Sequence, residues 1–392
     1  MTCQLSLPYQ LTDAIEKFWE IETVSPVVKI DPQNVVAEEH FRTTHSRDLN
    51  GRYVVRLPFK DSTSPDLGNY YKPALNRFLK LEHRLNKLPE MKESYCNTII
   101  EYLESNYVSP AVAPSKFLLP HHCVTKDNSY SKIRIVFDAS FSAELGSLND
   151  HLVTGPKLQL DIRHVLLNFR RFPYVMASDI CQMYLQILIH PEDVPYQHFL
   201  FRFHSSESIR EYQLNRVTFG LSCSPFLAIR VIHQLVLDEG SSYPKASVAL
   251  KDNIYVDDIL TGAHSLDEAL ELQKELIELL RKGGFTLKKW MSNTPELLKF
   301  LNDSQQETLQ FSEPNNKSIK VLGMQWDPVT DCLSYNIPNF QLILTKRGIM
   351  SAVAQMYDPL GYLAPVIFRA KYYLQQLWNL KDLAGTVLFQ QQ

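Results

Sequence analysis

Long hydrophobic runs are absent from this sequence of 392 residues. No apolar stretch approaches the roughly 18 residues that a membrane-spanning helix requires. No basic segment leads into an apolar run near the start, so we expect no signal peptide. The hydrophobic content of 45% and the charged content of 21% are typical of an ordinary soluble globular protein. At this length we expect two or three domains.

Cysteine is sparse as well. The six cysteines lie far apart, at Cys3, Cys96, Cys123, Cys181, Cys223 and Cys332. They form no C-x-x-C pair that would indicate a zinc site, and their sparseness is typical of reduced thiols in a reducing compartment. We therefore interpret them as buried or incidental cysteines.

An excess of positive charge is missing too. The net charge of -3 counts mildly against indiscriminate nucleic-acid binding, which usually shows as a basic domain. It does not exclude a locally basic cleft, because an enzyme that acts on nucleic acid also needs carboxylates for its metal ions. The total charge therefore leaves this class of function open.

Neither an internal repeat nor a low-complexity tract is present, so the organisation of the chain is read from its apolar pattern. Up to about residue 90 the chain reads as an extension, in which the pattern predicts a helix over 11–21, a polar loop over 31–50 and a strand over 51–59. Two further helices are predicted over 74–87 and 94–107.

From about residue 115 short strands alternate with helices. Strands are predicted at 132–137, 174–178, 199–203 and 211–217, and helices at 160–171, 224–237, 265–281 and 346–380. Hairpins are predicted within 199–217, within 249–259 and within 321–335. Ser265 and Glu268 form a capping box, and Gly283 ends that helix. Because strands and helices are interspersed without a regular βαβ period, the sequence predicts the α+β class.

Two adjacent carboxylates, Asp257 and Asp258, stand in a hydrophobic run at the turn of the second predicted hairpin. Neighbouring strand residues point to opposite faces, so both acids serve one site only near a turn. Held close together they repel each other and lose solvation, and a divalent cation such as Mg²⁺ removes both penalties. The alternative is a merely polar turn, and on this pair alone the two interpretations are evenly matched.

A further carboxylate, Asp179, ends the apolar strand predicted at 174–178. A strand that presents an acid at its C-terminal end is suited to place a metal ligand at a cleft. If this strand pairs beside the acidic hairpin, Asp179 and Asp257 can bridge two metal ions about 4 Å apart, which is the geometry of in-line phosphoryl transfer. The alternative role of Asp179 is a cap for the following turn.

Three motifs follow one another in the order found in reverse transcriptases. Asp179 with Tyr184 resembles their first catalytic motif, Phe219-Gly220 within VTFGLSCSPF resembles the second, and YVDD resembles the YxDD motif. The phrases LPHHCVTKDNSYSKIRIVFDAS, SLNDHLVTGPKL, SDICQMYLQI, GGFTLKKWMSN and KVLGMQWDP are similar to BEL/Pao-type long-terminal-repeat retrotransposons. The chain therefore resembles the reverse transcriptase region of such a polyprotein, from about residue 115 onward and more weakly before it.

This resemblance implies a right-hand polymerase fold, with an extension over 1–90, fingers and palm over 91–310, and a primer grip with a partial thumb over 311–392. It implies an RNA-directed DNA polymerase, in which a primer 3′-hydroxyl attacks the α-phosphate of a deoxynucleotide and pyrophosphate leaves. The implied partners are an RNA or DNA template with its primer, deoxynucleoside triphosphates, and other polyprotein segments (gag, protease, ribonuclease H and integrase). The implied location is a cytoplasmic virus-like particle or the nucleus, with no membrane.

The resemblance also implies the metal site and the sugar contact. Two Mg²⁺ ions, or Mn²⁺ in their place, would be held by Asp179, Asp257 and the carbonyl of Ile180. Asp258 would complete the acidic cluster. Tyr184 would lie beneath the incoming sugar, where its ring excludes a 2′-hydroxyl, unless it is simply an aromatic residue of the core.

Further substrate contacts are implied around the nucleotide. Arg134 and Lys126 would reach the triphosphate, for which a guanidinium is well matched, although either could be a solvated surface charge. Phe219 and Gly220 would lie against the nucleotide and template, since glycine permits close backbone approach. Tyr255 belongs to the same substrate-binding set.

The last implied contacts concern the leaving group and the primer. Lys289, in preference to Lys288, would protonate the leaving pyrophosphate. Leu322, Gly323 and Met324 would form the primer grip that holds the 3′ end, although a plain surface hairpin has a similar pattern.

The end of the chain resembles a segment known in this family as Pao retrotransposon peptidase, in the stretch GIMSAVAQMYDPLGYLAPVIFRAK. The sequence holds no Asp-Thr-Gly or Asp-Ser-Gly signature of an aspartic peptidase. Only 66 residues follow Trp326, which is short for a thumb plus a ribonuclease H domain, so we expect a fragment or a degraded copy of a longer polyprotein. The main alternative function is therefore a non-catalytic, nucleic-acid-binding remnant, with a peptidase a lesser one.

Overall fold

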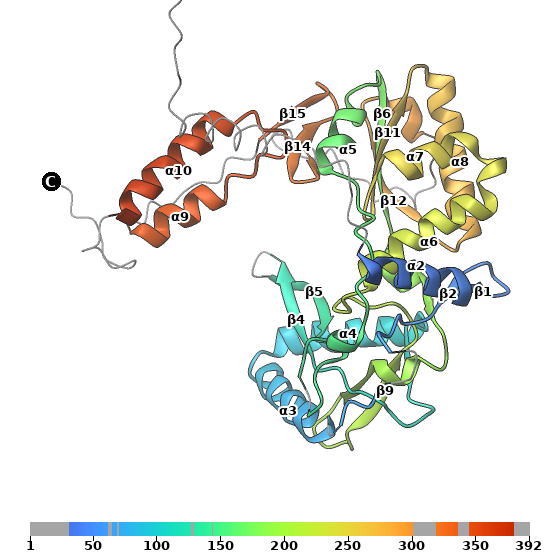
Figure 1. Cartoon of the computed structure of the whole chain (residues 1–392), viewed down its shortest axis with the longest axis vertical. Coiled ribbons are helices and arrows are strands. Elements are labelled where there is room, and N and C mark those ends of the chain that lie inside the picture. Colours follow the sequence, from blue (N-terminus) through green and yellow to red (C-terminus); the bar gives the residue numbers. More distant parts are fainter. Residues whose placement is uncertain are drawn as a thin grey trace, which may run out of the picture.

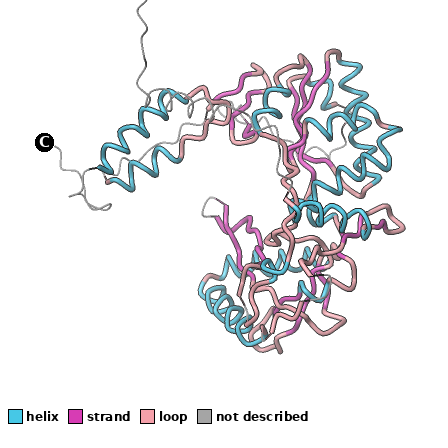
Figure 2. The backbone as a smooth tube through the Cα atoms, viewed as in Figure 1, coloured by secondary structure: helices cyan, strands magenta, loops and turns pink. Residues whose placement is uncertain are grey.

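The computed structural model describes residues 31–61, 65–68, 70–126, 129–142, 144–299, 301, 319–335 and 345–379. These residues form an open, C-shaped molecule with a lower body, an upper body and an arm that extends from the upper body (Figure 1). Short strands and helices are mixed in both bodies (Figure 2), as the predicted α+β class requires. The helix predicted over 11–21 lies outside the described residues.

The upper body is built on a four-stranded antiparallel sheet in the order β10-β11-β6-β12. Its strands are β6 (Tyr174–Ile180), β10 (Ile254–Tyr255), β11 (Asp258–Ala263) and β12 (Leu287–Ser292). Three helices cover one face of this sheet (Figure 1): α6 (Ser224–Glu239), α7 (Pro244–Asp252) and α8 (Leu266–Lys282). Half of the predicted capping box of α8 is present, because the Glu268 amide donates to the Ser265 hydroxyl oxygen at 3.3 Å. The Glu268 carboxylate accepts the amide of His264 at 3.3 Å instead of that of Ser265.

The opposite face of the sheet packs against α5 (Ile162–Phe169) and a small antiparallel sheet. That small sheet consists of β13 (Ile319–Val321), β14 (Met324–Asp327) and β15 (Cys332–Ser334). The ring of Trp326 meets the ring of Phe169 edge-on at 5.0 Å between centroids. The predicted hairpin within 321–335 is thereby confirmed as β14–β15, with β13 added beside it.

The side chains of β6 alternate between these two faces, as in any strand. Met176 and Ile180 belong to the main hydrophobic core with the helices, whereas Val175 and Ala177 belong to the second cluster with Trp326. Asp179 continues the odd-numbered series. Its carboxylate therefore faces the side of the sheet on which the β13–β15 sheet lies.

The lower body contains α3 (Tyr71–Lys87) and α4 (Pro89–Glu104), which confirm the two helices predicted there. Its strands are β3 (Val108–Pro110), β4 (His121–Lys126), β5 (Ser129–Phe137), β8 (His198–Phe201) and β9 (Arg210–Leu214). β4 pairs with β5, and β8 pairs with β9 as the predicted hairpin. The β4–β5 hairpin projects from the lower body toward the opening of the C (Figure 1).

The polar loop predicted over 31–50 is wrong. The structure has a helix there, α2 (Pro32–Thr44), followed by β1 (Ser46–Arg47). Asp31 caps the helix by accepting the Gln33 amide at 3.0 Å, and proline occupies its first position, a common start signal. Only Ala37 and Phe41 of α2 are buried, so the polar composition concealed a narrow apolar stripe.

Two other predicted boundaries need correction. The strand predicted over 51–59 is limited to β2 (Tyr53–Val55), which pairs with β7 (Leu188–Ile189) in parallel. The hairpin predicted over 249–259 begins later, because α7 continues to Asp252. Three residues of α7 are buried at helical spacing: Ala246, Ala249 and Leu250. This spacing is typical of a helix with one face in the core.

Described residues before position 90 also contribute to the main hydrophobic core, among them Phe41, Tyr53 and Phe78. The domain boundaries at 90 and 310 stay predictions.

The arm consists of α9 (Lys346–Ala354) and α10 (Ala364–Asn379), which confirm the predicted terminal helical region. In the described part of the chain, no helix has the length and apolar character needed to cross a membrane.

Candidate active site

The three predicted carboxylates come together at one end of the upper sheet. Asp258 of β11 is the direct cross-strand partner of Asp179 of β6, so their side chains share a face and their Cα atoms lie about 4.5–5.5 Å apart. The amide of Ile180 donates to the carbonyl oxygen of Asp257 at 2.7 Å. The strand of Asp179 therefore pairs with the acidic hairpin, which is the condition on which the sequence predicted a shared metal site.

The turn between β10 and β11 contains only Val256 and Asp257, because Tyr255 pairs with Asp258. Val256 has a φ of +59°, a left-handed conformation that is rare for a β-branched residue. Such strained positions cost about 1–3 kcal/mol and gather at functional sites. In this tight turn Asp257 leaves the regular alternation of side chains between the two faces of the sheet. Asp257 and Asp258 therefore both lie near one site, although they are adjacent in sequence.

The acids are held in an environment that opposes their ionisation. Burial, followed by the charge of Asp179, raises the pKa of Asp257. Burial, followed by the charges of Asp257 and Asp179, raises the pKa of Asp258 to about 6. Nearby cations, with Lys289 common to both acids, offset part of these shifts. A bound cation would relieve the remaining repulsion.

Lys289 is the lysine that reaches the cluster. Its Nζ lies 3.1 Å from Oδ2 of Asp179. Lys288 is the backbone register partner of Asp179, and the register shifts between Lys288 and Met291. Within this irregular stretch Lys289 has a φ of +55°, and such a β-bulge re-aims a side chain. The geometry thus supports Lys289, which the sequence preferred over Lys288.

A cavity of about 410 Å³ opens beside the carboxylates. Asp179, Asp258 and Lys289 are among its lining residues, together with apolar residues of the sheet such as Leu260 and the three residues of β13. Across the described ranges no three His, Cys, Asp or Glu side chains are grouped so as to enclose a metal ion by themselves. Any ion would therefore need ligands beyond these carboxylates, such as backbone or substrate oxygens.

Two aromatic rings and an arginine lie together near this end of the sheet. Tyr184, in a short 3-10 helix after β6, contacts Phe219 at 4.6 Å between ring centroids. The guanidinium of Arg134, on β5, lies 5.8 Å from the centre of the Phe219 ring. Burial, followed by the charge of Asp257, raises the pKa of Tyr184. The structure thus brings Tyr184, Phe219 and Arg134 together beside the acidic cluster.

Gly220 is the point at which the second motif touches the lower body. It has a φ of +110°, and a Cβ atom there would lie 1.9 Å from the carbonyl oxygen of Phe137. Only glycine allows so close an approach without a backbone shift. Lys126, the other predicted phosphate contact, ends β4, and its side chain lies outside the described part of the chain.

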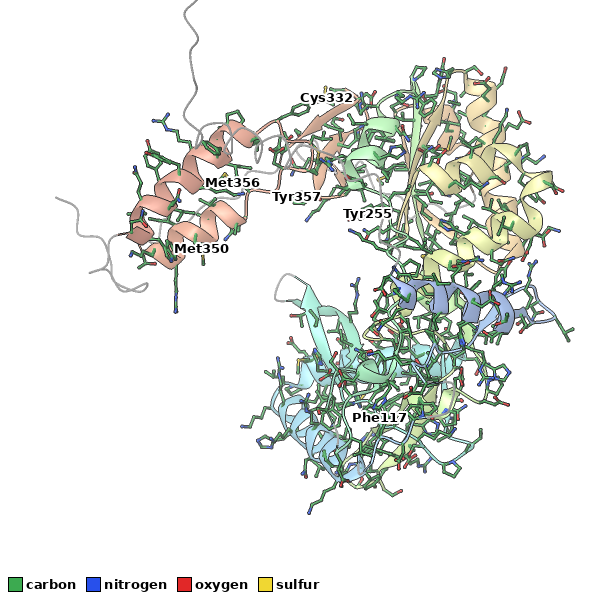
Figure 3. All side chains as sticks on the ribbon, in the orientation of Figure 1. Phe117, Tyr255, Cys332, Met350, Met356 and Tyr357 are labelled. Carbon is green, nitrogen blue, oxygen red and sulfur yellow. The ribbon has the colours of Figure 1, made fainter. Side chains whose placement is uncertain are left out.

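The predicted primer grip lies on the same face of the sheet as Asp179. Leu322 and Gly323 form the turn between β13 and β14 with φ angles of +46° and +86°, and Met324 is buried. Tyr255 packs against the same hydrophobic cluster as Leu322 and Met324. Figure 3 shows Tyr255 and Tyr357 on the side of the upper body that faces the opening.

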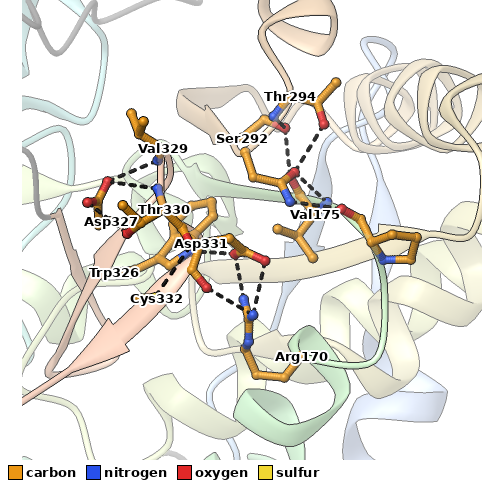
Figure 4. Close-up of polar contacts among 12 residues, drawn as sticks. Arg170, Val175, Ser292, Thr294, Trp326, Asp327, Val329, Thr330, Asp331 and Cys332 are labelled. Atoms are coloured by element: carbon orange, nitrogen blue, oxygen red, sulfur yellow. Dashed lines mark hydrogen bonds and ion pairs between the residues drawn. The ribbon is translucent and has the colours of Figure 1, made fainter.

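An ion pair that the sequence did not suggest fastens this hairpin to α5. Nη1 of Arg170 donates to Oδ1 of Asp331 at 2.6 Å, and Nη2 donates to Oδ2 at 3.0 Å. Asp331 also accepts the indole N–H of Trp326 at 3.0 Å (Figure 4). Arg170 and Asp331 are 161 positions apart in the sequence, so no local sequence pattern predicts this ion pair.

Solved structures with the same fold define the class. The foamy viral protease-reverse transcriptase in complex with RNA/DNA hybrid is 13% identical, has a TM-score of 0.51, and the match covers 96% of this chain and 44% of that chain. Its dRH form in complex with ds DNA is 13% identical, has a TM-score of 0.54, and the match covers 98% and 58%. The chain spans about half the length of these proteins. The fold is the α+β polymerase fold that the sequence predicted.

Two protein-family models match the chain and identify its family. One described as reverse transcriptase (RNA-dependent DNA polymerase) matches residues 131–325, and one described as Pao retrotransposon-like RNaseH-like domain matches residues 345–384. The chain is the reverse transcriptase region of a Pao-type retrotransposon polyprotein. The second model describes the arm segment as RNaseH-like, in place of the peptidase name that the resemblance suggested. None of the curated proteins matches the chain.

Proposed function

We propose that this chain is an RNA-directed DNA polymerase that extends a primer with deoxynucleotides. The observation that carries the proposal is the cluster of Asp179, Asp257 and Asp258, of which Asp179 and Asp258 line the cavity. Ionised Asp257 and Asp258 oppose folding, since both have raised pKa values. Groups with such perturbed pKa values are typical of a functional site.

The donor set fits Mg²⁺, with Mn²⁺ as a substitute, because hard carboxylate oxygens are the ligands that these ions prefer. Asp179, Asp257 and the carbonyl of Ile180 would hold two ions, and Asp258 would complete the negative cluster. When bound, the ions would neutralise charge on the transferred phosphate and activate the primer hydroxyl.

Lys289 supplies the proton for the leaving group in this proposal. Its ammonium is held beside the cluster by Asp179 at 3.1 Å. A lysine in that position can donate a proton to the oxygen of the departing pyrophosphate. The primer 3′-hydroxyl loses its proton to water and attacks the α-phosphate, and the bond from the α-phosphorus to the pyrophosphate oxygen breaks as Lys289 protonates that oxygen.

The incoming nucleotide would occupy the space around Arg134, Tyr184 and Phe219. Arg134 is exposed on β5 and would bind the triphosphate, assisted by Lys126. Tyr184 is buried beneath Phe219, where a bulky ring would exclude a 2′-hydroxyl and so select deoxynucleotides. Phe219 and Gly220 would lie against the nucleotide and template, while the space that glycine leaves at position 220 is filled by the carbonyl oxygen of Phe137.

The template–primer duplex would lie in the opening between the lower body and the arm. The matching foamy viral structures are complexes with an RNA/DNA hybrid and with ds DNA, and we propose the same partners here. Leu322, Gly323 and Met324 would hold the primer end, and Tyr255 would lie beside it. The expected association with other polyprotein segments, in a cytoplasmic particle or the nucleus, stays a prediction.

The rival function is a nucleic-acid-binding remnant without catalysis. The intact set of three carboxylates disfavours it, because a remnant has no use for acids whose charge opposes folding. Primer extension on a homopolymer RNA template with Mg²⁺ and the complementary deoxynucleotide separates the two. Incorporation supports the polymerase, whereas well-folded protein that binds template–primer and adds nothing supports the remnant.

A further inference from the structure

Asn149 joins three segments of the chain through one side chain. Its Nδ2 donates to the carbonyl oxygen of Gly220 and to the hydroxyl of Ser140, both at 2.9 Å. Its Oδ1 accepts the amide of Ser222 at 2.8 Å. Both amide hydrogens and the amide oxygen of the side chain are therefore used.

The backbone of Asn149 adds a further link. Its own N–H donates to the carbonyl oxygen of Ala139 at 3.0 Å. Ala139 and Ser140 lie two and three residues beyond the end of β5, the strand that carries Arg134. Asn149 thus ties the end of β5 to the loop that contains Phe219 and Gly220, which lies 71 positions further along the chain.

Contacts on both sides fix the conformation of this loop. Gly220 is held at a φ of +110° with its Cα against the carbonyl oxygen of Phe137. On the far side of the loop, the hydroxyl of Ser224 donates to the carbonyl oxygen of Thr218 at 2.6 Å. Ser224 therefore holds the start of the loop, and Asn149 holds the part that contacts β5.

The loop in turn fixes the position of the Phe219 ring. This ring is in contact with Tyr184 at 4.6 Å and lies 5.8 Å from the guanidinium of Arg134. A shift of the loop by about 1 Å would therefore disturb two groups that face the nucleotide, and a displacement of that size is enough to weaken positioning substantially.

We propose that Asn149 is a positioning residue for the incoming nucleotide, acting through the Phe219–Gly220 loop. The inference rests on the proposed polymerase function. It assigns no contact between Asn149 and the substrate. The side-chain amide of Asn149 fixes the distance between Arg134 and Phe219, and this distance sets the affinity for the nucleotide.

Asn149→Ala is the direct test, with two readouts. The first is amide hydrogen exchange of a peptide spanning 219–222, which needs no enzyme activity. We expect faster exchange there, because the Ser222 amide loses its acceptor. The second is steady-state primer extension, in which we expect the KM for the deoxynucleotide to rise by about tenfold and kcat to change by less than about threefold.

Matched variants separate positioning from general loss of structure. Asn149→Asp keeps the acceptor for Ser222 but cannot donate to Gly220, so we expect protected exchange at 222 together with a raised KM. Ser140→Ala removes one partner of Asn149 and leaves the loop contacts intact. Ser222→Ala removes a buried hydroxyl that has no hydrogen-bond partner. Both serine variants should keep the wild-type KM.

Unchanged exchange in Asn149→Ala would overturn the inference. So would faster exchange with an unchanged KM, or a fall in kcat and in template–primer affinity to the same extent as the loss of nucleotide affinity. If the wild-type chain does not extend a primer, the proposed function fails, and the nucleotide role of Asn149 fails with it. The exchange measurement would still decide whether Asn149 holds the loop, so the two failures are distinguishable.

Discussion

Replacing Gly220 by alanine should destabilise the protein much more than the same change at Gly146. Both glycines have similar backbone conformations, with φ angles of +110° and +103°. Alanine is strained in this region by about 1–3 kcal/mol at either position. The two sites differ in space, because a Cβ atom would lie 1.9 Å from the carbonyl oxygen of Phe137 at Gly220, and 3.4 Å from the nearest atom, Oδ2 of Asp150, at Gly146.

The additional loss at Gly220 follows from that contact. The new methyl group and the Phe137 oxygen must separate by roughly 1.5 Å before they reach an ordinary contact distance of about 3.4 Å, and a close-packed interior resists such a shift. Overpacking of this kind costs about 1–3 kcal/mol beyond the backbone strain. We therefore expect a loss of about 2–6 kcal/mol for Gly220→Ala and about 1–3 kcal/mol for Gly146→Ala.

Urea unfolding followed by tryptophan fluorescence measures both variants. The difference between them isolates the close approach to Phe137, since the backbone strain is common to both. Nucleotide KM for Gly220→Ala should also rise, because the shift moves β5 and with it Arg134. Equal losses of stability at the two glycines would show that the close approach to Phe137 does not make position 220 the more sensitive one.

Three further predictions concern the site and its support. Asp258→Asn should stabilise the metal-free protein by about 1–3 kcal/mol at pH 7.5, because a pKa raised to about 6 means that the charged form opposes folding. The gain should shrink as the pH falls through 6 and be below about 1 kcal/mol near pH 4, where folded Asp258 is neutral and only the unfolded carboxyl, with its ordinary pKa of 3.8, is still partly ionised; urea unfolding at pH 7.5 and at pH 4 checks this, and a pH-independent gain contradicts it. Tyr184→Val should lower discrimination between deoxynucleotides and ribonucleotides in single-nucleotide incorporation, and unchanged discrimination would exclude Tyr184 as the sugar contact. Arg170→Ala should speed hydrogen exchange in 324–334 relative to Arg171→Ala, since it alone removes the pair with Asp331; equal exchange would count against that anchor.

Much of the fold was predictable where local signals agree. The helix α8 has a capping serine, an amphipathic face and a terminal glycine, and the structure places it within one residue of the prediction at each end. The helix α2 has a cap at Asp31 and a proline start, yet its stripe of two buried residues is too narrow to outweigh its polar composition. Tertiary packing of Phe41 against Phe226, at 6.4 Å between ring centroids, supplies what the local pattern lacks.

The acidic centre was predictable because its residues are chemically unusual in apolar strands. The supporting contacts were not, because they depend on register and on distant partners. The choice of Lys289 follows from a bulge in β12 that no local residue pattern marks. Asn149 stands in a phrase that the resemblance includes, but only the folded chain brings its amide to Gly220.

The most direct test of the polymerase centre is single-nucleotide incorporation by three proteins. Wild type, Asp257→Asn and the control Asp267→Asn are compared on the same template–primer with Mg²⁺; Asp267 is an exposed acid in the first turn of α8, outside the cluster. Both variants change the net charge equally. We expect incorporation by wild type and Asp267→Asn, and a loss of at least about a hundredfold for Asp257→Asn with template–primer binding retained. Equal incorporation by all three folded proteins would contradict it.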